Sequence, residues 1–265
     1  MAKKQVKKLI AVLLVVSMIA GMCLTSASAV TFTDTNGHWA KTYIDSGITA
    51  GYIDGYSDGT FKPDGSVTRA EFAKMLVEAL GITGTTTIAF KDVPAGKWYY
   101  SYVQKAVYAG FISGYSDNTF RPDNNITRQE AAAMISRIVT APTTTKSATI
   151  YKDYASIDKA WALQYVETVL SKGYMTGDNN GNFRPNSTLT RGEAAKIITS
   201  ILQTEKIVKV NQSISSAVSY SNTLFVNNVI IANSVGSGSV SFANCRVLGA
   251  MNIAGGGSSG ISLSN

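Results

Sequence analysis

The chain has 265 residues, of which 45% are hydrophobic and 15% charged, which excludes a disordered protein and predicts one or two folded domains. Its formal net charge is +7, but residues 1–29 hold four of the 24 basic residues and none of the 17 acidic ones. The rest of the chain therefore carries only +3, which gives no support for nucleic-acid binding.

Residues 1–29 predict a secretory signal peptide. Four lysines precede an apolar run from Leu9 to Ala20, and the small residues 26–29 form a cleavage site. The run is too short for a comfortable membrane span, so we expect a secreted protein without membrane contact after signal removal. Cys23 is expected to leave with the signal, and Cys245 alone allows no intramolecular disulfide. An exported chain without disulfides fits a bacterial envelope.

A four-residue motif then occurs three times. Thr68-Arg69-Ala70-Glu71 returns 59 residues later as Thr127-Arg128-Gln129-Glu130, and 63 residues after that as Thr190-Arg191-Gly192-Glu193. Each copy comes eight residues or fewer after an aromatic-basic-proline triplet, the first being Phe61-Lys62-Pro63. Such repeats decide the architecture. We therefore expect three repeats, at 30–85, 86–149 and 150–205, followed by a different segment at 206–265.

Repeat one predicts two helices joined by a turn-rich loop. The first helix carries Tyr43, Ile44 and Ile48 and ends near Gly51. The loop at 54–61 is rich in Gly, Ser and Asp, so we expect a compact loop or tight hairpin. The second helix is predicted from Arg69 to about Leu80, where Gly81 closes it.

Repeats two and three have the same order. In repeat two we expect a helix that ends at Gly110 and another from Arg128 to about Val139. In repeat three we expect a helix that ends at Gly173 and another from Arg191 to about Leu202. The Thr-rich stretches 83–88 and 140–149 are predicted linkers. The loop of repeat three, 177–183, lacks the Tyr-Ser pair that follows the loop glycine in the other two.

The composition changes after Ile207, and Arg246 is the only charged residue from Val210 onward. Ser, Asn, Gly and Val dominate. Alternation with period two predicts short strands within 224–231, 239–242, 246–253 and 261–263, stacked as about three rungs of a β-helix or β-solenoid. Three rungs are the minimum for a stable solenoid, so we expect the start of a longer structure or a weakly stable tail.

The repeated motif has the form of a capping box. The Thr hydroxyl is expected to accept from the amide of the Glu, while the Glu carboxylate reaches back to the amide of the Thr. This assigns a structural role to Thr68, Thr127 and Thr190 and argues against catalysis by Glu71, Glu130 and Glu193.

The arginines of the motif need another explanation, because a cation at the first helical position opposes the helix dipole. One reading is that Arg69, Arg128 and Arg191 are exposed beside free helix-terminal amides, with a bound anion or glycan between them. The other is a pure ion pair with Asp34, Asp92 or Asp153 of a neighbouring repeat. Both hold at once if a paired arginine also binds a ligand.

Each repeat has one tryptophan, Trp39, Trp98 or Trp161, five to eight residues after its aspartate. A tryptophan that opens a short helix is more often a core residue, yet an aromatic face beside planar charged groups is also typical of carbohydrate sites. The stretch 54–65 resembles the start of an EF-hand but ends in glycine instead of glutamate. His38 is the only histidine, so we expect no His-based metal cluster, and no cofactor.

The full pattern is Phe/Tyr-x-Asp…Trp…Gly-Tyr-Ser-Asp-x-Thr-Phe-x-Pro-Asp…Thr-Arg-x-Glu, three times over residues 30–205. It resembles the S-layer homology (SLH) domain. The resemblance implies a mainly α fold in which three helix-loop-helix units form a pseudo-trimeric, three-pronged bundle. It also implies non-covalent attachment to an acidic, often pyruvylated secondary cell-wall polysaccharide linked to peptidoglycan, held in grooves between the prongs.

The resemblance also implies roles for particular residues. The contact with the acidic sugar falls on Arg69, Arg128 and Arg191. Groove or supporting positions fall on Asp34, Asp92, Asp153, Trp39, Trp98, Trp161, Gly55, Gly114 and Gly177. Repeat three departs most from the pattern, and Gly192 lowers its helix propensity behind Arg191. Any groove that relies on repeat three is therefore expected to bind more weakly.

Three functions remain open. The leading one is a cell-wall anchoring module at the cell surface, without catalysis of its own. The second is the anchor part of a polysaccharide-acting enzyme, which is disfavoured because no Asp, Glu, His or Lys follows Lys209. The third is a structural S-layer or adhesin subunit whose exposed β edge allows self-association.

Overall fold

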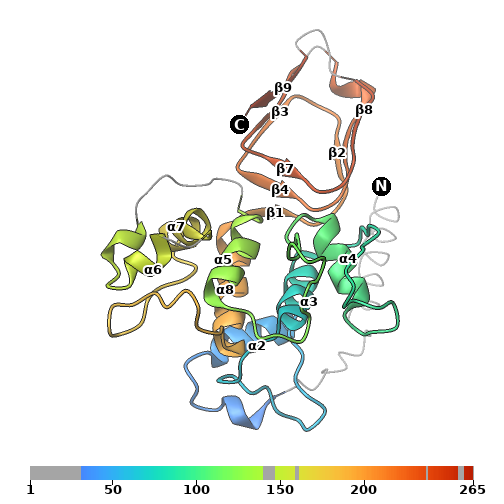
Figure 1. Cartoon of the computed structure of the whole chain (residues 1–265). Helices are drawn as coiled ribbons and strands as arrows, with labels where there is room; N and C mark the ends of the chain where they lie inside the picture. Colours follow the sequence, from blue (N-terminus) through green and yellow to red (C-terminus); the bar gives the residue numbers. More distant parts are fainter. Residues whose placement is uncertain (1–30, 140–146, 159–160, 237, 256–259, 265) are drawn as a thin grey trace, which may run out of the picture. The chain divides into compact units, whose positions relative to one another are not determined.

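The computed structural model describes residues 31–139, 147–158, 161–236, 238–255 and 260–264. The predicted signal peptide and most of the second predicted linker lie outside these residues. The described residues form seven α-helices, α2 to α8, followed by nine short strands, β1 to β9 (Figure 1).

Each repeat supplies a first and a second main helix, as the sequence predicts. These pairs are α2 (Lys41–Thr49) and α3 (Arg69–Leu80), α4 (Tyr100–Tyr108) and α5 (Arg128–Ser136), and α7 (Leu163–Ser171) and α8 (Arg191–Thr204). Helix α5 ends three residues before the predicted Val139. The short helix α6 (Tyr154–Asp158) and the 3-10 turns η1 (Thr33–Thr35) and η2 (Ser147–Ile150) were not predicted.

The second helix of each repeat begins at a capping box, which confirms the prediction. The amides of Glu71, Glu130 and Glu193 donate to the hydroxyls of Thr68, Thr127 and Thr190, and each glutamate accepts in return from the threonine amide. The reciprocal pair satisfies two donors that a helix start would otherwise leave free. The structural role assigned to these residues therefore holds.

A closed ring of backbone hydrogen bonds joins the three repeats. Val67 N–H donates to the carbonyl of Leu189, Leu189 N–H to that of Ile126, and Ile126 N–H to that of Val67, at 2.9–3.0 Å. All three side chains are fully buried. Because each residue comes shortly before a capping box, the ring brings the starts of α3, α5 and α8 together.

The helix pairs are exchanged between repeats. Helix α2 packs against α8, α4 against α3, and α7 against α5. The first helix of each repeat thus lies on the second helix of the preceding repeat, with repeat one lying on repeat three. Surfaces between these partners are therefore built from different repeats. Sequence spacing gives no sign of this exchange.

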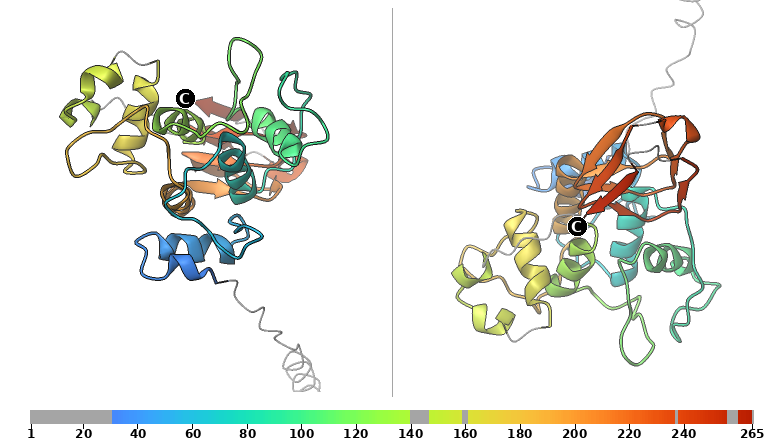
Figure 2. Two further views of the ribbon diagram at one scale, coloured as in Figure 1. Left: turned by 60° about the horizontal axis from the view of Figure 1, so that its bottom comes forward. Right: turned by 90° about the horizontal axis from the view of Figure 1, so that it is seen from above.

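Residues 206–264, called here the β segment, form three parallel sheets. Their orders are β1-β4-β7, β2-β5-β8 and β3-β6-β9, so each coil of the chain adds one strand to each sheet (Figure 2). The strands are β1 Lys206–Val208, β2 Gln212–Ile214, β3 Val218–Ser221, β4 Thr223–Phe225, β5 Val229–Ile231, β6 Val240–Ala243, β7 Arg246–Val247, β8 Met251–Ile253 and β9 Ile261–Ser264.

The strand pattern differs from the prediction in two ways. The predicted runs 224–231 and 246–253 are each divided into two strands on different sheets. Strands β1 to β3, which complete the first coil, were not predicted. The breaks fall at residues 226–228 and 248–250. Asn222 and Asn244 have left-handed φ values of 49° and 51° and turn the chain just before these runs, between β3 and β4 and between β6 and β7.

Stacked side chains hold the β segment together. Phe225 packs edge-on against Tyr220 and Phe242, with ring centroids 5.1 and 5.9 Å apart. At one corner the side chain of Asn211 accepts from the amide of Asn228, whose side chain accepts from the next coil in turn. Each coil therefore supplies both apolar contacts and polar partners to its neighbours.

The first sheet of the β segment lies on the helices. Leu224 and Val226 belong to the same apolar core as the helices. Lys209 Nζ donates to the carbonyl of Ala79 at the end of α3, while Arg246 donates to those of Ala109 and Arg137 after α4 and α5. Cations are favoured at helix C-termini, so these two residues tie the β segment to repeats one and two.

Candidate functional site

The three arginines of the repeated motif are buried, with 5–6% of each residue exposed. Each pairs with the capping-box glutamate of the next repeat. Nη1 lies 3.2 Å from Glu130 in Arg69, 2.9 Å from Glu193 in Arg128, and 3.1 Å from Glu71 in Arg191. The three pairs close a cycle like that of the backbone ring.

The sequence-based prediction of exposed arginines is therefore wrong, and so is the alternative with the aspartates. The sequence places the glutamates in capping boxes, and the structure gives the same carboxylates a second bond across the repeat boundary. Burial lowers the pKa of Arg69 and Arg128, and the facing glutamates oppose that shift.

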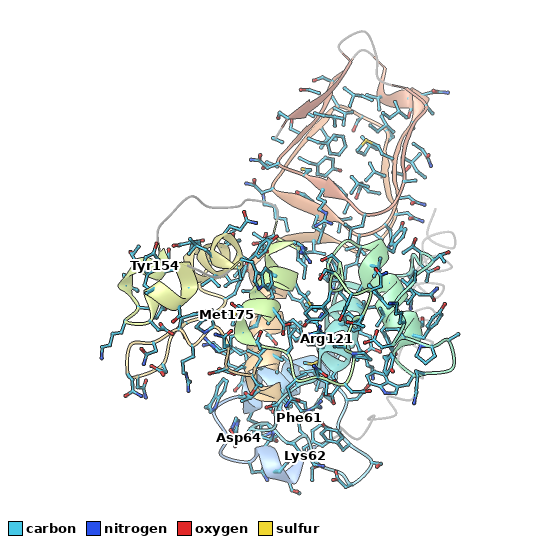
Figure 3. All side chains as sticks on the ribbon, in the orientation of Figure 1. Phe61, Lys62, Asp64, Arg121, Tyr154 and Met175 are labelled. Atoms are coloured by element: carbon cyan, nitrogen blue, oxygen red, sulfur yellow. The ribbon has the colours of Figure 1, made fainter. Side chains whose placement is uncertain are left out.

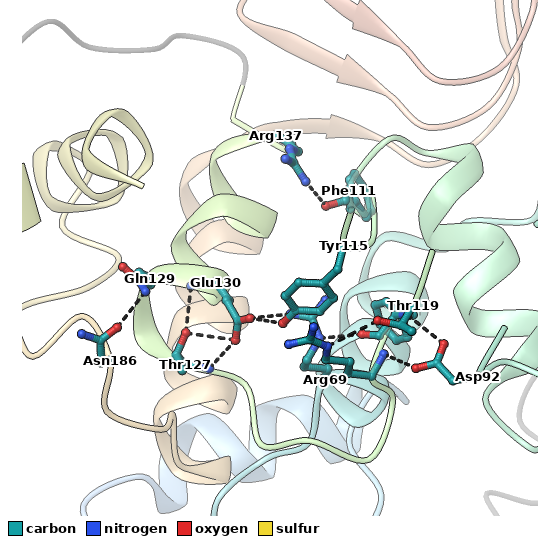
Figure 4. A network of polar contacts seen from close by, with 12 residues as sticks. Arg69, Asp92, Phe111, Tyr115, Thr119, Thr127, Gln129, Glu130, Arg137 and Asn186 are labelled. Atoms are coloured by element: carbon teal, nitrogen blue, oxygen red, sulfur yellow. Dashed lines mark hydrogen bonds and ion pairs between the residues drawn. The ribbon is translucent and has the colours of Figure 1, made fainter. Parts of the chain in front are cut away.

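The same arginines bind the next repeat through Nε. Arg69 Nε donates to the carbonyl of Phe120, Arg128 Nε to Phe183 and Arg191 Nε to Phe61, each at 2.8 Å. Each guanidinium also lies over the ring of that phenylalanine, 4.6–4.9 Å from the centroid. Figure 4 shows Arg69 beside Tyr115 and Glu130. These contacts give the arginines a structural role that the sequence did not reveal.

The helix-terminal amides are also occupied. The amides of Arg69 and Ala70 donate to the carbonyls of Asn124 and Pro122 in the next repeat, and α5 and α8 start in the same way. The amides of Glu71, Glu130 and Glu193 are used by the capping boxes. An anion cannot therefore be held by free amides at these helix starts, and a ligand must be met by side chains instead.

The three aspartates support the loops from within their own repeats. Asp34 accepts from the amides of Phe61 and Lys62, and Asp92 and Asp153 accept from the equivalent pairs. The residue before each proline, Lys62, Arg121 or Arg184, has an unusual left-handed φ of 56–58°. Each carboxylate holds this strained turn in place. Figure 3 labels Lys62 and Arg121 in these turns.

The tryptophans are exposed, which excludes the core alternative and leaves their expected groove positions as a prediction. The exposed fractions are 54% for Trp39, 53% for Trp98 and 59% for Trp161. Each ring still touches an aromatic neighbour: His38, Tyr102 and Tyr165 lie 5.3–6.4 Å away between centroids. These contacts hold the indoles as surface platforms.

Three grooves bring these residues together, numbered here by the repeat whose loop lines them. Groove 1 contains the loop at Gly55, Trp98 of repeat two and Arg191 of repeat three. Groove 2 contains the loop at Gly114, Trp161 of repeat three and Arg69 of repeat one. Groove 3 contains the loop at Gly177, Trp39 of repeat one and Arg128 of repeat two. Every groove thus contains all three repeats.

The loop glycines lie where a side chain would not fit. A Cβ at Gly55 or Gly177 would come 2.1 Å from the ring of Phe32 or Tyr151, and at Gly114 it would come 2.2 Å from that of Phe90. The role of these glycines is therefore close packing of the loop. A tyrosine follows two of them: Tyr56 donates to Glu71, and Tyr115 donates to Glu130. Burial, followed by the bond to Glu130, raises the pKa of Tyr115 to about 12.

The grooves differ in size and charge. Their volumes are about 220, 400 and 470 Å³ for grooves 1, 2 and 3. Groove 1 has two cations, Arg191 and Lys74, against two carboxylates. Groove 2 has two cations, Arg69 and Arg137, against one carboxylate. Groove 3 has three cations against two carboxylates, and Asp178 replaces the tyrosine.

Sequence reasoning did not single out several groove residues. Lys74 and Lys196 lie further along the second helices, Arg137 lies directly after α5, and Tyr56 and Tyr115 follow the loop glycine. The tyrosines could have been found from their repeated position, but the helix residues could not, because their faces depend on the exchanged packing. Among the described residues, no three His, Cys, Asp or Glu side chains are arranged to hold a metal ion. Nor is any helix there long and apolar enough to cross a membrane.

Comparison with known proteins identifies an enzyme, an anchoring protein and a surface-layer protein as relatives. The amylopullulanase of Thermoanaerobacterium thermosulfurigenes is 35% identical over 65% of this chain and 10% of its own length. The cellulosome-anchoring protein of Acetivibrio thermocellus is 31% identical over 59% of this chain and 36% of its own length. The surface-layer 125 kDa protein of Lysinibacillus sphaericus is 30% identical over 71% of this chain and 16% of its own length.

The chain thus spans between a tenth and about a third of the length of these relatives. The similarity supports a secreted location at the cell wall or cell surface. The S-layer homology domain matches residues 31–73, 89–132 and 150–195, together half of the chain and one match for each repeat. The chain therefore belongs to the S-layer homology domain family.

Proposed function

We propose that this chain anchors an exported protein to the bacterial cell wall by binding an acidic secondary cell-wall polysaccharide in its three grooves. The observation that carries the proposal is the composition of each groove: a buried, ion-paired arginine at one side and an indole more than half exposed at the other. A planar cation suits a carboxylate, and an indole face suits a sugar ring.

The pyruvate ketal of a wall sugar is the acidic group we propose. It places a carboxylate directly on the sugar ring, so one residue of the polysaccharide can meet both the indole and the guanidinium. Arg69, Arg128 and Arg191 are the proposed carboxylate contacts, and Trp39, Trp98 and Trp161 the proposed sugar platforms. The three aspartates and the loop glycines support these contacts from behind.

The fold explains why three repeats are needed. We propose that residues 30–85, 86–149 and 150–205 act as one pseudo-trimeric, three-pronged bundle, followed by a short β-solenoid at 206–265. Because each groove draws residues from every repeat, one repeat alone contains no complete groove. The weaker binding expected of repeat three is therefore shared among the grooves. Repeat three supplies its loop to groove 3, Arg191 to groove 1 and Trp161 to groove 2.

A binding test decides the proposal. Residues 30–265 are mixed with purified wall polysaccharide before and after mild acid treatment that removes pyruvate, and the bound fraction is measured. We expect binding to the untreated polymer and a loss of at least tenfold in affinity after treatment, as for a lost charge-assisted contact. Unchanged binding after treatment would reject recognition of pyruvate while leaving wall anchoring intact. No binding to either polymer would reject the anchor itself.

A second candidate is a structural surface-array subunit that self-associates through the β segment. The observation in its favour is apolar exposure near the end of the described chain, where Ile253 is 56% and Leu263 65% exposed. An edge without charges can pair with another chain. Ordered assemblies formed on dilution from denaturant, and lost on Leu263→Lys, would support this candidate; a monomer at all concentrations would reject it.

A further inference from the structure

A fourth groove lies apart from the other three, where one corner of the β segment meets the helical body (Figure 1). It is called here the junction groove and has a volume of about 620 Å³, within the usual range for ligand sites. Its walls are residues 83–84 after α3, Tyr108 at the end of α4, and residues 209–211, 226–228 and Gly249 of the β segment. None of these described residues belongs to grooves 1 to 3.

One wall of the junction groove is an aromatic ring that is held in place. Tyr108 lies so close to the backbone of Gly84 that a Cβ there would come 2.2 Å from the ring. The tyrosine is 37% exposed, and its hydroxyl makes no hydrogen bond with the described residues. A ring that is fixed on one side and lines a groove on the other is a platform for a sugar, because it loses little rotamer freedom on binding.

Another wall has two carboxamides at the same corner of successive coils. Oδ1 of Asn211 accepts from the amide of Asn228 at 3.2 Å, and Oδ1 of Asn228 accepts from the amide of Ala250 at 2.9 Å. The two side-chain NH2 groups make no hydrogen bond with the described residues, and neither is fully buried. They are two donors open to a ligand, about 4.8 Å apart because neighbouring parallel strands have that spacing.

A third asparagine joins the walls of the groove. Asn227 Nδ2 donates to the carbonyl of Lys209, and its Oδ1 accepts from the hydroxyl of Thr83 at 3.3 Å. Lys209 is the one charged residue among the described residues that line the groove, and its Nζ donates to the carbonyl of Ala79. The groove therefore offers amide donors and an aromatic face, whereas grooves 1 to 3 each contain an arginine. An uncharged acceptor suits it better than a carboxylate.

We propose that the junction groove binds an uncharged, N-acetylated sugar chain. The ring of Tyr108 contacts the face of one sugar, and the NH2 groups of Asn211 and Asn228 donate to acetamido carbonyls or hydroxyls. Val210 is 68% exposed beside these donors and packs against an acetamido methyl group. An acetamido group thus matches the donors and the apolar side chain together, which a plain hydroxyl does not.

Two further points define the ligand. An extended peptide also offers carbonyl acceptors, but it has no flat ring of hydroxyls for Tyr108, and the polar walls give no pocket for its side chains. The site is independent of the proposed function, because it shares no residue with grooves 1 to 3 and needs no acidic group. Failure of pyruvate recognition in those grooves would leave it unchanged.

Two isosteric substitutions test the site. Asn211→Asp and Asn228→Asp keep the oxygen that accepts from the next coil and replace the NH2 donor with a second oxygen. Asn252→Asp, at an exposed position of β8 outside the groove, adds the same charge and is the matched control. The probes are a chain of four N-acetylglucosamine residues and a chain of four glucose residues. Binding to residues 30–265 is measured by calorimetry.

We expect the N-acetylated chain to bind at least about threefold more tightly than the glucose chain, as for one added hydrogen bond. Asn211→Asp and Asn228→Asp should each weaken its binding at least about tenfold, because a carboxylate then faces an acceptor oxygen. Asn252→Asp should leave it unchanged. Equal binding of the two probes would overturn the preference for N-acetylation. No binding, binding that survives both substitutions, or an equal loss in the control would overturn the site.

NMR of the unmodified chain covers the case in which a variant fails to fold. The side-chain NH2 signals are followed while the N-acetylated chain is added. Those of Asn211 and Asn228 should shift together, and that of Asn227, whose NH2 group is bound to Lys209, should shift less. Shifts confined to the indole signals would place the sugar in grooves 1 to 3 and reject the junction groove. Asparagine shifts with a capped Ala-Gly tetrapeptide, and none with the sugar, would assign the groove to a peptide and reject the sugar.

Discussion

In the helical body, residues 31–204, charged side chains join neighbouring repeats; in the β segment, uncharged side chains join neighbouring coils. The body has three buried arginine–glutamate pairs across its repeat boundaries. The β segment uses stacked rings and asparagine bonds, and Arg246 is its only charged residue beyond Lys209. Both regions are repetitive, and the arginines that join the repeats of the body also line its three grooves.

The difference shows how binding can be built into a fold. A buried ion pair is costly to desolvate and adds little net stability, but it holds a charged group in a fixed direction. The proposed binding grooves need such fixed groups, whereas the stacked coils use apolar area and asparagine hydrogen bonds. The predictions below test this division, and they begin with the largest expected effect.

Phe225→Ala should destabilise the β segment by about 3–5 kcal/mol, the usual cost of removing a buried phenylalanine. Phe225 is fully buried between Tyr220 and Phe242. Amide hydrogen exchange in β5 and β6 should speed up strongly. All three tryptophans lie in the body, so tryptophan fluorescence in denaturant should change much less. Ile253→Ala, at a side chain that is 56% exposed, is the control.

An equal shift of both signals would break the comparison, because the two regions would then unfold as one cooperative unit.

Arg128→Met should lower the free energy of unfolding of the body by about 2–4 kcal/mol, because it leaves Glu193 without its cation. We expect the lower part of that range, since the Glu193 side chain is 29% exposed and water screens it. Chemical denaturation followed by tryptophan fluorescence measures the effect. Lys196→Met, on α8 like Glu193 and also facing groove 3, should change stability by less than about 0.5 kcal/mol. A loss below 1 kcal/mol in Arg128→Met would show that the pair joins repeats only weakly.

These arginines also mark the limit of what the sequence predicts. The capping boxes, the two main helices of each repeat and the loop were all predicted, because each depends on residues close together in the chain. The partners of Arg69, Arg128 and Arg191 lie 61, 65 and 120 residues away and are set by the exchange of helices between repeats. Local spacing has no information about that exchange.

In the β segment, in contrast, a local feature was not predicted. Its period-two alternation predicted strands and about three coils, but not the corners between strands. Asn222 and Asn244 turn the chain just before the predicted runs 224–231 and 246–253, and each of these runs is itself divided between two strands. Strands β1 to β3 were missed because Lys, Gln and Ser together occupy half of their positions and weaken the apolar signal.

Arg246→Met should cost about 1–3 kcal/mol, because two helix C-terminal carbonyls lose a charged donor. The residue joins the two regions, and its burial, followed by the charge of Arg137, lowers its pKa. We expect faster hydrogen exchange in β7 and at the ends of α4 and α5 and little change in β9. Lys206→Met, an exposed cation on β1, is the matched control. Identical exchange in both variants would mean that apolar contacts alone hold the regions together.

Acid should weaken the body and leave the β segment unaffected. Burial acts to raise the pKa of Glu130, but the amide of Thr127, the hydroxyl of Tyr115 and Arg69 outweigh it and lower the pKa. A lowered folded pKa adds stability above the unfolded value, which is lost as the pH falls through the folded one. No Asp or Glu occurs after Glu205. Between about pH 5 and pH 3, tryptophan fluorescence in denaturant should therefore report a lower stability of the body.

Glu130→Gln provides the control for the acid effect, because glutamine can keep the capping box while removing the charge. Its stability should be lower at neutral pH and should vary less between pH 5 and pH 3. The same acid dependence in both proteins would assign the effect to other carboxylates.

Trp161→Ala should have the smallest effect on stability among these variants, although it should weaken ligand binding directly. Trp161→Ala removes an indole that is 59% exposed, so the free energy of unfolding should change by less than about 1 kcal/mol. Binding to the wall polysaccharide should fall about two- to tenfold, the range for one lost aromatic contact. Ile150→Ala, at a side chain that is 77% exposed and outside the three grooves, controls for the loss of exposed apolar area. If both substitutions weakened binding equally, the exposed indole would have no special part in it, and the division between linking residues and ligand-facing residues would fail in groove 2.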